Sequence, residues 1–246
     1  MSNRKIPFSI TVRTVEQYSK SIKRFVFEDN SKRITKLDES AYLKLHLQMN
    51  DSKTVKRSYT IREVDERNNT VIIDFVIHGE NGPASKWAMN AKSGDQLIVT
   101  GPGPTKLIDL SCDWFMLIGD MTSLPAIAAN TKLLPANAKG YIIIGVAHKS
   151  DIQLLNLPAG MKIDWVVNSD TNNNPKIFLE LIQSKQWYEG KPYIWMAGEF
   201  NIAKNIRQFF KEKKVAREHR YISSYWKSGE TDEGHKQAKK LEFSGI

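Results

Sequence analysis

The apolar patterning of this chain changes at Gly101-Pro102-Gly103-Pro104, and this change constrains the fold more than any other feature. Before it, short stretches of alternating apolar and polar residues predict an antiparallel sheet or barrel. After it, continuous apolar runs alternate with helical stretches, which is typical of a parallel α/β sheet. The 246 residues suffice for both. We predict a β-barrel domain over residues 1–108 and an α/β domain over residues 109–246.

Turn residues at Asn68-Asn69 and Ser93-Gly94-Asp95 separate the expected strands of the first domain. One helix is expected from Pro83 to about Ala91, because proline suits the first turn of a helix. The predicted strands cover residues 21–27, 42–49, 58–63, 70–77 and 96–100.

The second domain is expected to alternate strands and helices and to end in a polar helical tail over residues 228–246. In an open α/β sheet, ligands bind beyond the carboxyl ends of the strands. A barrel followed by such a domain suits two large ligands. The predicted strands cover residues 114–118, 141–146, 163–167, 193–197 and 221–225, and the helices 123–134, 175–185 and 201–214.

Composition and charge exclude several classes of protein. The net charge of +9 gives a basic surface that attracts anions or is simply solvated, and no motif for binding nucleic acid accompanies it. The start of the chain lacks the apolar stretch of a secretory signal, and no later stretch has the apolar length of a membrane span. We therefore expect a soluble, cytoplasmic protein with neither nucleic acid nor membrane as a partner.

The single cysteine, Cys112, excludes an internal disulfide. The five histidines show no metal-ligand spacing to one another or to Cys112. We expect no resident metal, so that any iron arrives with a substrate.

The sharpest local signal is the hexapeptide Arg57-Ser58-Tyr59-Thr60-Ile61-Arg62 on a predicted strand. The period of two places Arg57, Tyr59 and Ile61 on one face and the other three residues on the opposite face. A flavin dinucleotide needs a guanidinium for its pyrophosphate, an aromatic or hydroxyl group near the ring, and a short donor near the reactive nitrogen. The hexapeptide contains all three types. The alternative is a charged edge strand with a core tyrosine.

A second signal is the segment His78-Gly79-Glu80-Asn81-Gly82-Pro83-Ala84-Ser85-Lys86-Trp87-Ala88. A glycine-bearing loop that enters a helix offers backbone N–H groups and a positive dipole end, which bind phosphate. In the alternative interpretation, Trp87 is a core residue, Ser85 belongs only to the first helical turn and His78 ends a strand.

The two segments at this spacing, followed by Gly94-Asp95 and Gly101-Pro102, resemble the siderophore-interacting protein family. These are FAD-binding ferric-siderophore reductases related to the ferredoxin-NADP reductases. The resemblance continues through residues 119–127, 195–199 and 225–229, and so covers nearly the whole chain. No Gly-x-Gly-x-x-Gly is present, which disfavours a Rossmann dehydrogenase but not this superfamily.

The resemblance implies a β-barrel that binds FAD and an α/β domain that binds NADH or NADPH. Tyr59 and Thr60 would lie nearest the flavin. As a structural alternative, Asp120 and Glu199 cap the helices that follow them. The chain departs from the family pattern in lacking a basic residue between Pro102 and Gly103, although Lys106 is close. The implied FAD residues are Arg57, Ser58, Tyr59, Thr60, His78, Gly82, Pro83, Ala84, Ser85 and Trp87, and the implied nicotinamide residues are Asp120, Thr122, Pro125, Ala197, Gly198 and Glu199.

The implied reaction passes electrons from NAD(P)H, or from a ferredoxin, through FAD to a ferric siderophore and releases Fe(II). A basic rim would attract an anionic siderophore, catecholate or hydroxamate, unless these residues only make the tail soluble. Two other functions remain open, a general flavin or ferredoxin reductase and a siderophore-binding protein without turnover. The residues expected to form the rim are Arg217, Arg220, Lys236, Lys239 and Lys240.

Overall fold

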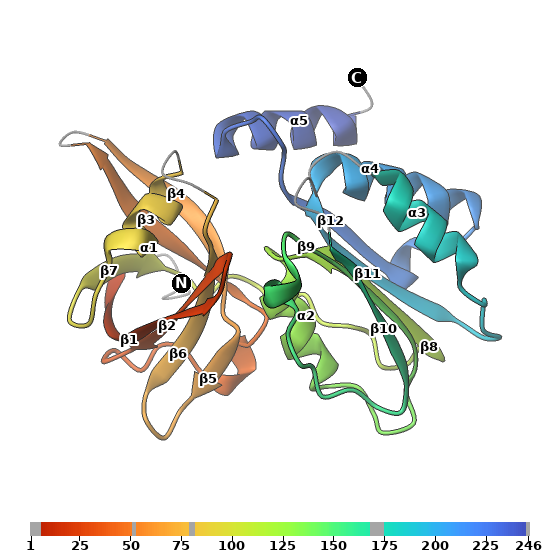
Figure 1. The fold of residues 1–246 in the computed structure, drawn as a ribbon, viewed down its shortest axis with the longest axis horizontal. Helices are drawn as coiled ribbons and strands as arrows, with labels where there is room; N and C mark the ends of the chain where they lie inside the picture. The colour runs from red at the N-terminus through yellow and green to blue at the C-terminus, as the bar shows by residue number, and fades with distance from the viewer. Residues whose placement is uncertain (1–5, 51–52, 79–81, 168–174, 245–246) are drawn as a thin grey trace. The chain divides into compact units, whose positions relative to one another are not determined.

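The computed structural model describes residues 6–50, 53–78, 82–167 and 175–244 (Figure 1). The chain divides into two compact units, one of residues 1–107 with 125–130 and one of residues 108–124 with 131–246. The first holds an antiparallel sheet and the second a parallel sheet, which confirms the predicted fold class. The assignment of residues 125–130 to the first unit fits the bonds of Asn130, whose side-chain amide donates to the carbonyl of Lys106.

The first unit is a seven-stranded sheet in the order β4-β3-β7-β1-β2-β6-β5. One short helix, α1, follows β6, and a 3-10 turn lies between β2 and β3. The elements are β1 Phe8–Ser19, β2 Ile22–Glu28, β3 Tyr42–Asn50, β4 Lys53–Thr60, β5 Glu63–Asp65, β6 Thr70–Val76, α1 Pro83–Asn90, β7 Gln96–Thr100 and the turn Lys36–Asp38.

One continuous stretch of chain, β4 followed by β5 and here called the ribbon, closes this sheet into a barrel. Its first part pairs with β3, and the N–H of Ile61 still donates to the carbonyl of Ala41 at 2.8 Å. The next residue changes partner, because the N–H of Arg62 donates to the carbonyl of Ile72 in β6 at 2.9 Å. The ribbon thus bonds to both sides of the sheet. The predicted strand over residues 58–63 spans this change of partner.

Aromatic side chains fill one end of the barrel core. Phe25 and Phe75 are fully buried, with ring centroids 4.9 Å apart, and Trp87 of α1 packs against both. Buried positions alternate along several strands, as at Ile10 and Val12 of β1 and at Leu97 and Val99 of β7. The apolar period of the first hundred residues therefore reflects a real barrel interior.

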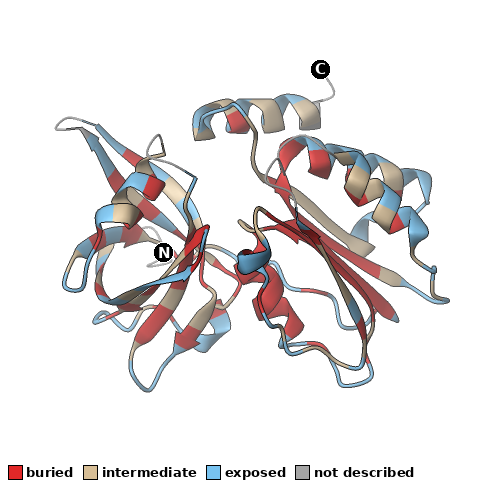
Figure 2. Ribbon diagram, in the orientation of Figure 1, coloured by how far each residue is buried: buried red, intermediate tan, exposed pale blue. Residues whose placement is uncertain are grey.

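The second unit is built on a parallel sheet in the order β10-β9-β8-β11-β12. The strands β8, β9 and β11 are buried along nearly their whole length (Figure 2). Helix α4 buries Ile202, Ile206 and Phe210, a spacing of four that lines one helical face. The elements are β8 Trp114–Asp120, β9 Lys139–Val146, β10 Gly160–Val167, α3 Pro175–Ser184, β11 Pro192–Glu199, α4 Phe200–Glu212, β12 Arg220–Trp226, α5 Asp232–Ser244, and the 3-10 turns Lys149–Asp151 and Arg217–His219. The helix α2 Leu124–Thr131 follows β8 in the chain, and its residues 125–130 belong to the first unit.

The largest departure from the sequence prediction is β1, a strand of 12 residues that the apolar pattern did not indicate. Its alternation lasts only to Val12, because a register shift between Val12 and Thr14 interrupts the pairing with β2. Beyond the shift most side chains are exposed. Among the described residues, no helix has the length and apolar character needed to cross a membrane.

Candidate functional site

One part of the candidate site lies on the inward face of β4. Tyr59 is half-buried and stacks on Phe75, with ring centroids 4.3 Å apart. Burial raises the pKa of the Tyr59 phenol, so the ring is neutral at physiological pH. Arg57 is half-buried two residues earlier on the same face. The strand therefore presents an aromatic surface with a guanidinium next to it.

The opposite face of β4 carries the other two predicted residues. Ser58 is exposed, whereas Thr60 is buried at the end of the strand and pairs with Tyr42 of β3. Of these two hydroxyls, Thr60 lies closer to the point where the ribbon changes partner.

The start of α1 forms the second part of the site. The hydroxyl of Ser85, which is almost fully buried, accepts a hydrogen bond from the N–H of His78 at 3.3 Å. A Cβ added to Gly82 would lie 2.8 Å from the ring of the exposed His78, so a larger residue here would displace that ring. Gly82 is the N-cap and Pro83 opens the helix, so the N-cap residue itself offers no side-chain acceptor. Within the described part of the chain, no side chain accepts from the backbone N–H groups of the first turn, which suits a phosphate.

Phe75 brings the two parts together. Its ring stacks on Tyr59 and also contacts Trp87, with centroids 5.5 Å apart. The two segments that sequence analysis singled out are therefore neighbours within the first unit. The combination of an aromatic platform, a guanidinium and an uncapped helix start fits the ring and pyrophosphate of FAD. Trp87 itself packs against the barrel core, as the alternative interpretation held, and Ala84 is also buried. Residues 79–81 of the loop lie outside the described residues.

A groove of about 540 Å³ lies beside the loop that lacks the expected basic residue. Arg33 lines it together with residues 101–105. The guanidinium of Arg33 lies over the Phe8 ring and donates to the carbonyl of Ile6 at 2.9 Å. A cation is thus present at this loop, but it comes from a segment that sequence analysis did not single out.

In the second unit, the strand order reverses between β8 and β11. The chain proceeds from β8 to β9 and β10 on one side and then returns to β11 and β12 on the other side of β8. Ligands of open α/β sheets bind at this reversal of strand order. Asp120 ends β8 and Glu199 ends β11, so both lie at the reversal, as predicted.

Asp120 is a buried carboxylate that accepts several hydrogen bonds. One oxygen accepts from the N–H and hydroxyl of Thr122, at 2.8 and 2.5 Å, and the other from the indole N–H of Trp226 at 2.9 Å. Burial raises the pKa of Asp120, and the bonds from Thr122 and Trp226 oppose this increase. Trp226 is a partner that sequence analysis did not name, because it lies at the end of β12, 106 residues away in the chain.

Glu199 is fully buried and caps α4. Its carboxylate accepts from the backbone N–H groups of Asn201, Ile202 and Ser228. The alternative that Glu199 caps the helix after it is therefore observed. Glu199 joins the start of α4 to the chain that leaves β12, and its charge is neutralised locally by N–H dipoles.

Gly198 lies between these two acids. It has a φ of +156°, and a Cβ at this position would lie 2.6 Å from a carboxylate oxygen of Asp120. Ala197 is fully buried and pairs with Gly119 of β8. Pro125 is also buried, as the second residue of α2. The strand ends can therefore approach a ligand through backbone rather than through bulky side chains.

The basic residues of the last part of the chain lie on different elements. Arg217 belongs to the 3-10 turn before β12 and Arg220 begins β12, whereas Lys236 and Lys240 lie on α5, which packs against β12. Lys239 donates to the hydroxyl of Ser223 and the carbonyl of Ser224, and burial lowers its pKa.

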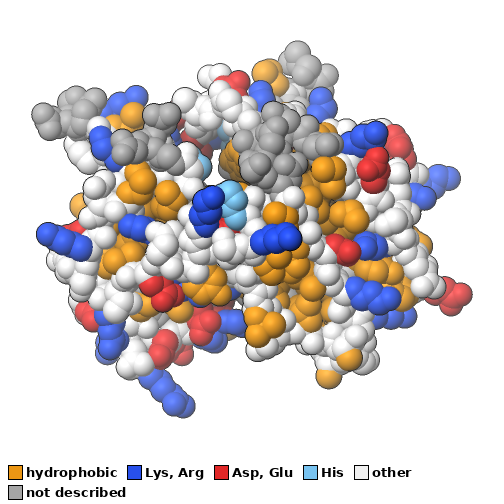
Figure 3. Space-filling model, in the orientation of Figure 1, with side chains coloured by type: hydrophobic (Ala, Val, Ile, Leu, Met, Phe, Trp, Pro, Cys, Tyr) orange, Lys and Arg blue, Asp and Glu red, His pale blue; other side chains and the backbone are white. Residues whose placement is uncertain are grey.

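Lys236 pairs with Asp232, and both Lys236 and Lys240 are exposed. On the face drawn in Figure 3, lysine and arginine side chains are scattered among apolar and acidic ones. The positive charge of this face is therefore dispersed.

Comparison with known proteins assigns the family of this chain. Residues 10–106 match the model of the siderophore-interacting FAD-binding domain, and residues 112–229 match the model of the siderophore-interacting protein. The chain belongs to the siderophore-interacting protein family. The two matched segments contain the barrel and the parallel sheet, and they confirm both the predicted family and its FAD-binding domain.

Members of this family are similar to this chain over most of its length. Ferric vibriobactin reductase ViuB of Vibrio cholerae is 34% identical over 189 residues, which cover 75% of this chain and 69% of the relative. The crystal structure of the siderophore-interacting protein SipS of Aeromonas hydrophila superposes with a TM-score of 0.88 at 28% identity, over 98% of this chain and 99% of that one.

Ferredoxin-NADP+ reductase of Plasmodium falciparum superposes with a TM-score of 0.65 at 16% identity over 89% of this chain and 96% of that one. This similarity concerns the fold alone, and it agrees with the predicted ferredoxin-NADP reductase-like architecture.

Proposed function

We propose that this protein is an FAD-dependent reductase that takes electrons from NADH or NADPH and reduces the Fe(III) of a ferric siderophore to Fe(II). The observation that carries the proposal is the contact of Phe75 with both Tyr59 and Trp87, which joins the two FAD segments. A relative at 34% identity is named a ferric vibriobactin reductase. We place the reaction in the cytoplasm, where reduced nicotinamide is available.

The residues of the barrel bind and orient the cofactor. Tyr59 supports the flavin ring from the side of Phe75, Arg57 pairs with the pyrophosphate, and the start of α1 donates N–H groups to it. When bound, FAD converts the two-electron hydride of the nicotinamide into single electrons for iron. The protein needs no nucleophile for this reaction, in agreement with the aromatic and backbone character of the site.

The carboxyl ends of β8 and β11 receive the nicotinamide dinucleotide in this proposal. Gly198 keeps the backbone open there, and the buried Asp120 and Glu199 hold the two turns in place through their hydrogen bonds to Thr122, Asn201 and Ile202. These acids are therefore positioning residues. A ferredoxin donor would need none of this arrangement.

Hard, anionic oxygen ligands prefer Fe(III) to Fe(II), so reduction alone loosens the complex. We propose that Lys236 and Lys240 attract the anionic chelate from the exposed side of α5. Lys239 is excluded from this role, since its ammonium group bonds to β12. Neutralising Lys236 and Lys240 together should raise the Michaelis constant for an anionic ferric siderophore and reduce its salt dependence.

Steady-state oxidation of NADH and NADPH, with and without a ferric siderophore and with an Fe(II)-specific chelator as the indicator, tests the function. Oxidation that depends on the siderophore and yields Fe(II) supports the proposal. Equal oxidation with any small acceptor indicates a general flavin reductase, and binding without oxidation indicates a siderophore-binding protein.

The Arg57→Ala variant tests the FAD site itself. We expect it to lose FAD, because a charge-assisted contact to a pyrophosphate contributes about 1.5–3 kcal/mol, or roughly 10- to 150-fold in affinity. The matched control is Lys56→Ala, on the exposed opposite face of the same strand. Normal flavin content in Arg57→Ala would place the pyrophosphate elsewhere.

A further inference from the structure

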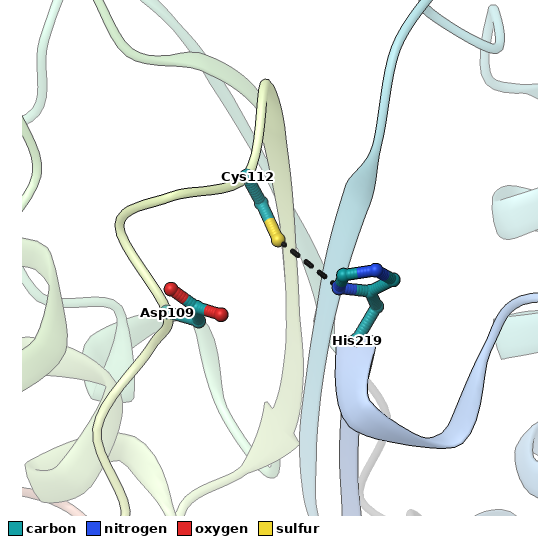
Figure 4. Close-up of side chains that lie close together, drawn as sticks. All are labelled: Asp109, Cys112 and His219. Atoms are coloured by element: carbon teal, nitrogen blue, oxygen red, sulfur yellow. Dashed lines mark hydrogen bonds between the residues drawn. The ribbon is translucent and has the colours of Figure 1, made fainter.

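Asp109, Cys112 and His219 lie close together at the amino-terminal edge of the parallel sheet (Figure 4). Asp109 and Cys112 belong to the turn before β8, and His219 is the last residue of the 3-10 turn before β12. Both strands run parallel to β11, and they flank it, so their starts meet at one edge. Sequence spacing gave no sign of this cluster, because Cys112 and His219 are 107 residues apart.

The donor atoms of the cluster have the spacing of a metal site. The carboxylate, sulfur and ring nitrogen all lie within 4.8 Å of one another, and Cys112 Sγ is 3.5 Å from His219 Nδ1. Tetrahedral zinc with bonds of about 2.3 Å to sulfur and 2.05 Å to nitrogen holds these two atoms about 3.6 Å apart. The cysteine and histidine thus need no rearrangement. Asp109 is exposed, so its side chain can rotate to bring the carboxylate to the same ion.

We propose that Asp109, Cys112 and His219 bind a divalent cation of the zinc class. A thiolate, an imidazole and a carboxylate are the three ligand types that zinc takes in proteins. Magnesium and calcium prefer oxygen ligands throughout, so a thiolate in the set excludes them. Three protein ligands leave the fourth position to water.

The charges around the thiol suit a cation. Burial raises the pKa of Cys112, and the neighbouring carboxylates of Asp109 and Asp113 raise it further, whereas Lys191 opposes them. The Asp109 carboxylate accepts from the N–H of Ser111 at 2.9 Å, which lowers its pKa and keeps it ionised. Cysteine binds metals as the thiolate, so metal binding releases the thiol proton.

The cluster is separate from the proposed nicotinamide site. Asp120 lies at the far end of β8, about 20 Å from the start of the strand. An ion here would connect the segment before β8 to the segment before β12 and stabilise the second unit without contacting the electron donor. The inference does not rest on the proposed function.

Thiol alkylation tests the site in the full chain with its flavin, after dialysis against a chelator. Cys112 is the only cysteine of the sequence, so iodoacetamide labelling followed by mass spectrometry reports on this thiol alone. We expect one equivalent of Zn²⁺ to slow alkylation at least about tenfold. With Co²⁺ as the probe, we expect a thiolate-to-cobalt charge-transfer band in the difference spectrum, in which the flavin absorption cancels. At 100 times the dissociation constant, Zn²⁺ should raise the melting temperature by roughly 5–10 °C.

Three variants assign the ligands. Cys112→Ser should abolish the cobalt band, and His219→Gln should weaken Zn²⁺ binding at least about tenfold, with Asp109→Asn weaker in effect because water can replace an exposed carboxylate. His46→Gln is the matched control, since His46 lies on β3 of the other unit. Circular dichroism establishes that each variant is folded.

Several results would overturn the proposal. They are the absence of Zn²⁺ binding to the wild-type chain, Zn²⁺ binding that leaves Cys112 fully reactive, and unchanged affinity in both Cys112→Ser and His219→Gln. Equal protection by Mg²⁺ would also refute it, because that ion does not select a thiolate.

Discussion

The hydrogen bond from Trp226 to Asp120 offers a direct test of how the carboxyl end of β8 is held. The Trp226→Phe variant keeps an aromatic ring but removes the indole N–H, which donates to Asp120 at 2.9 Å. A hydrogen bond to a charged group contributes about 1.5–3 kcal/mol, whereas one to a neutral group contributes about 0.5–1.5 kcal/mol. The cost of the substitution should therefore depend on whether Asp120 is ionised.

The direction in which stability changes with pH follows from the raised pKa of Asp120. Because the pKa of Asp120 is higher in the native state than in the unfolded chain, the native state holds the carboxyl proton more tightly. The stability that comes from protonated Asp120 is therefore present at low pH and is lost as pH rises through the folded pKa. Removing the indole raises that pKa further. We expect Trp226→Phe to destabilise the second unit by about 1.5–3 kcal/mol at pH 8, a decrease of roughly 3–12 °C in melting temperature, and by about 0.5–1.5 kcal/mol once Asp120 is protonated.

Hydrogen exchange of peptides from β8 and β11, measured over a pH series from pH 8 down to the acid limit of the folded state and corrected for the intrinsic rates, confines the comparison to the parallel sheet. Trp187→Phe is the control, because Trp187 is 42% exposed and makes an edge contact with Trp114 instead of a carboxylate bond. Equal destabilisation throughout the series, or none beyond that of the control, would refute the assignment of the Trp226 bond to an ionised Asp120.

Three further predictions concern other residues. Gly198→Ala should reduce stability by more than about 1 kcal/mol and slow flavin reduction by the nicotinamide, because its Cβ meets Asp120; stopped-flow reduction at the wild-type rate would contradict this. In His235→Gln, the free energy of unfolding should decrease less below about pH 6.5 than in the wild type. Burial lowers the pKa of His235, so the unfolded chain binds the proton first and the wild type loses stability as pH falls. Urea titrations that give both proteins the same decrease in unfolding free energy between pH 7.5 and 5.5 would refute it. Tyr59→Ala should weaken FAD more than Ser58→Ala does, since only Tyr59 lies on the face of Phe75; equal flavin retention in the two variants would exclude the ring contact.

Local sequence chemistry predicted the parts of the site that depend on a single segment. The period of two on β4 placed Arg57 and Tyr59 on one face, and Gly82 and Pro83 marked the start of α1. Continuous apolar runs predicted the strands over residues 114–118 and 193–197, since buried parallel strands have no polar face to interrupt the pattern, whereas Asp120 and Glu199 followed only from the resemblance to the family.

The contacts that depend on distant segments were not predictable in this way. Trp226 reaches Asp120 only because β12 lies beside β11 in the sheet, and that order depends on the whole topology. The basic residues from Arg217 to Lys240 are close in sequence, but Lys239 bonds to Ser223 and Ser224 because α5 packs against β12, and the sequence carried no sign of that contact. The cation at the Gly101 loop comes from Arg33, far earlier in the chain, and carries no local motif.

In the proposed function, FAD binding depends on the closure of the barrel by the ribbon of β4 and β5. Arg57 and Tyr59 lie only a few residues before Arg62, where the ribbon leaves β3 and bonds to β6. The seam is the place where the ribbon changes its pairing from β3 to β6. Any substitution that opens this seam, even one on the outer side of β6, lowers the fraction of barrels competent to bind FAD, and so weakens the apparent affinity of the protein for FAD. Conversely, bound FAD should protect the seam from exchange with solvent and from proteolysis, in proportion to its concentration. Flavin occupancy is thereby a measure of whether the barrel is closed.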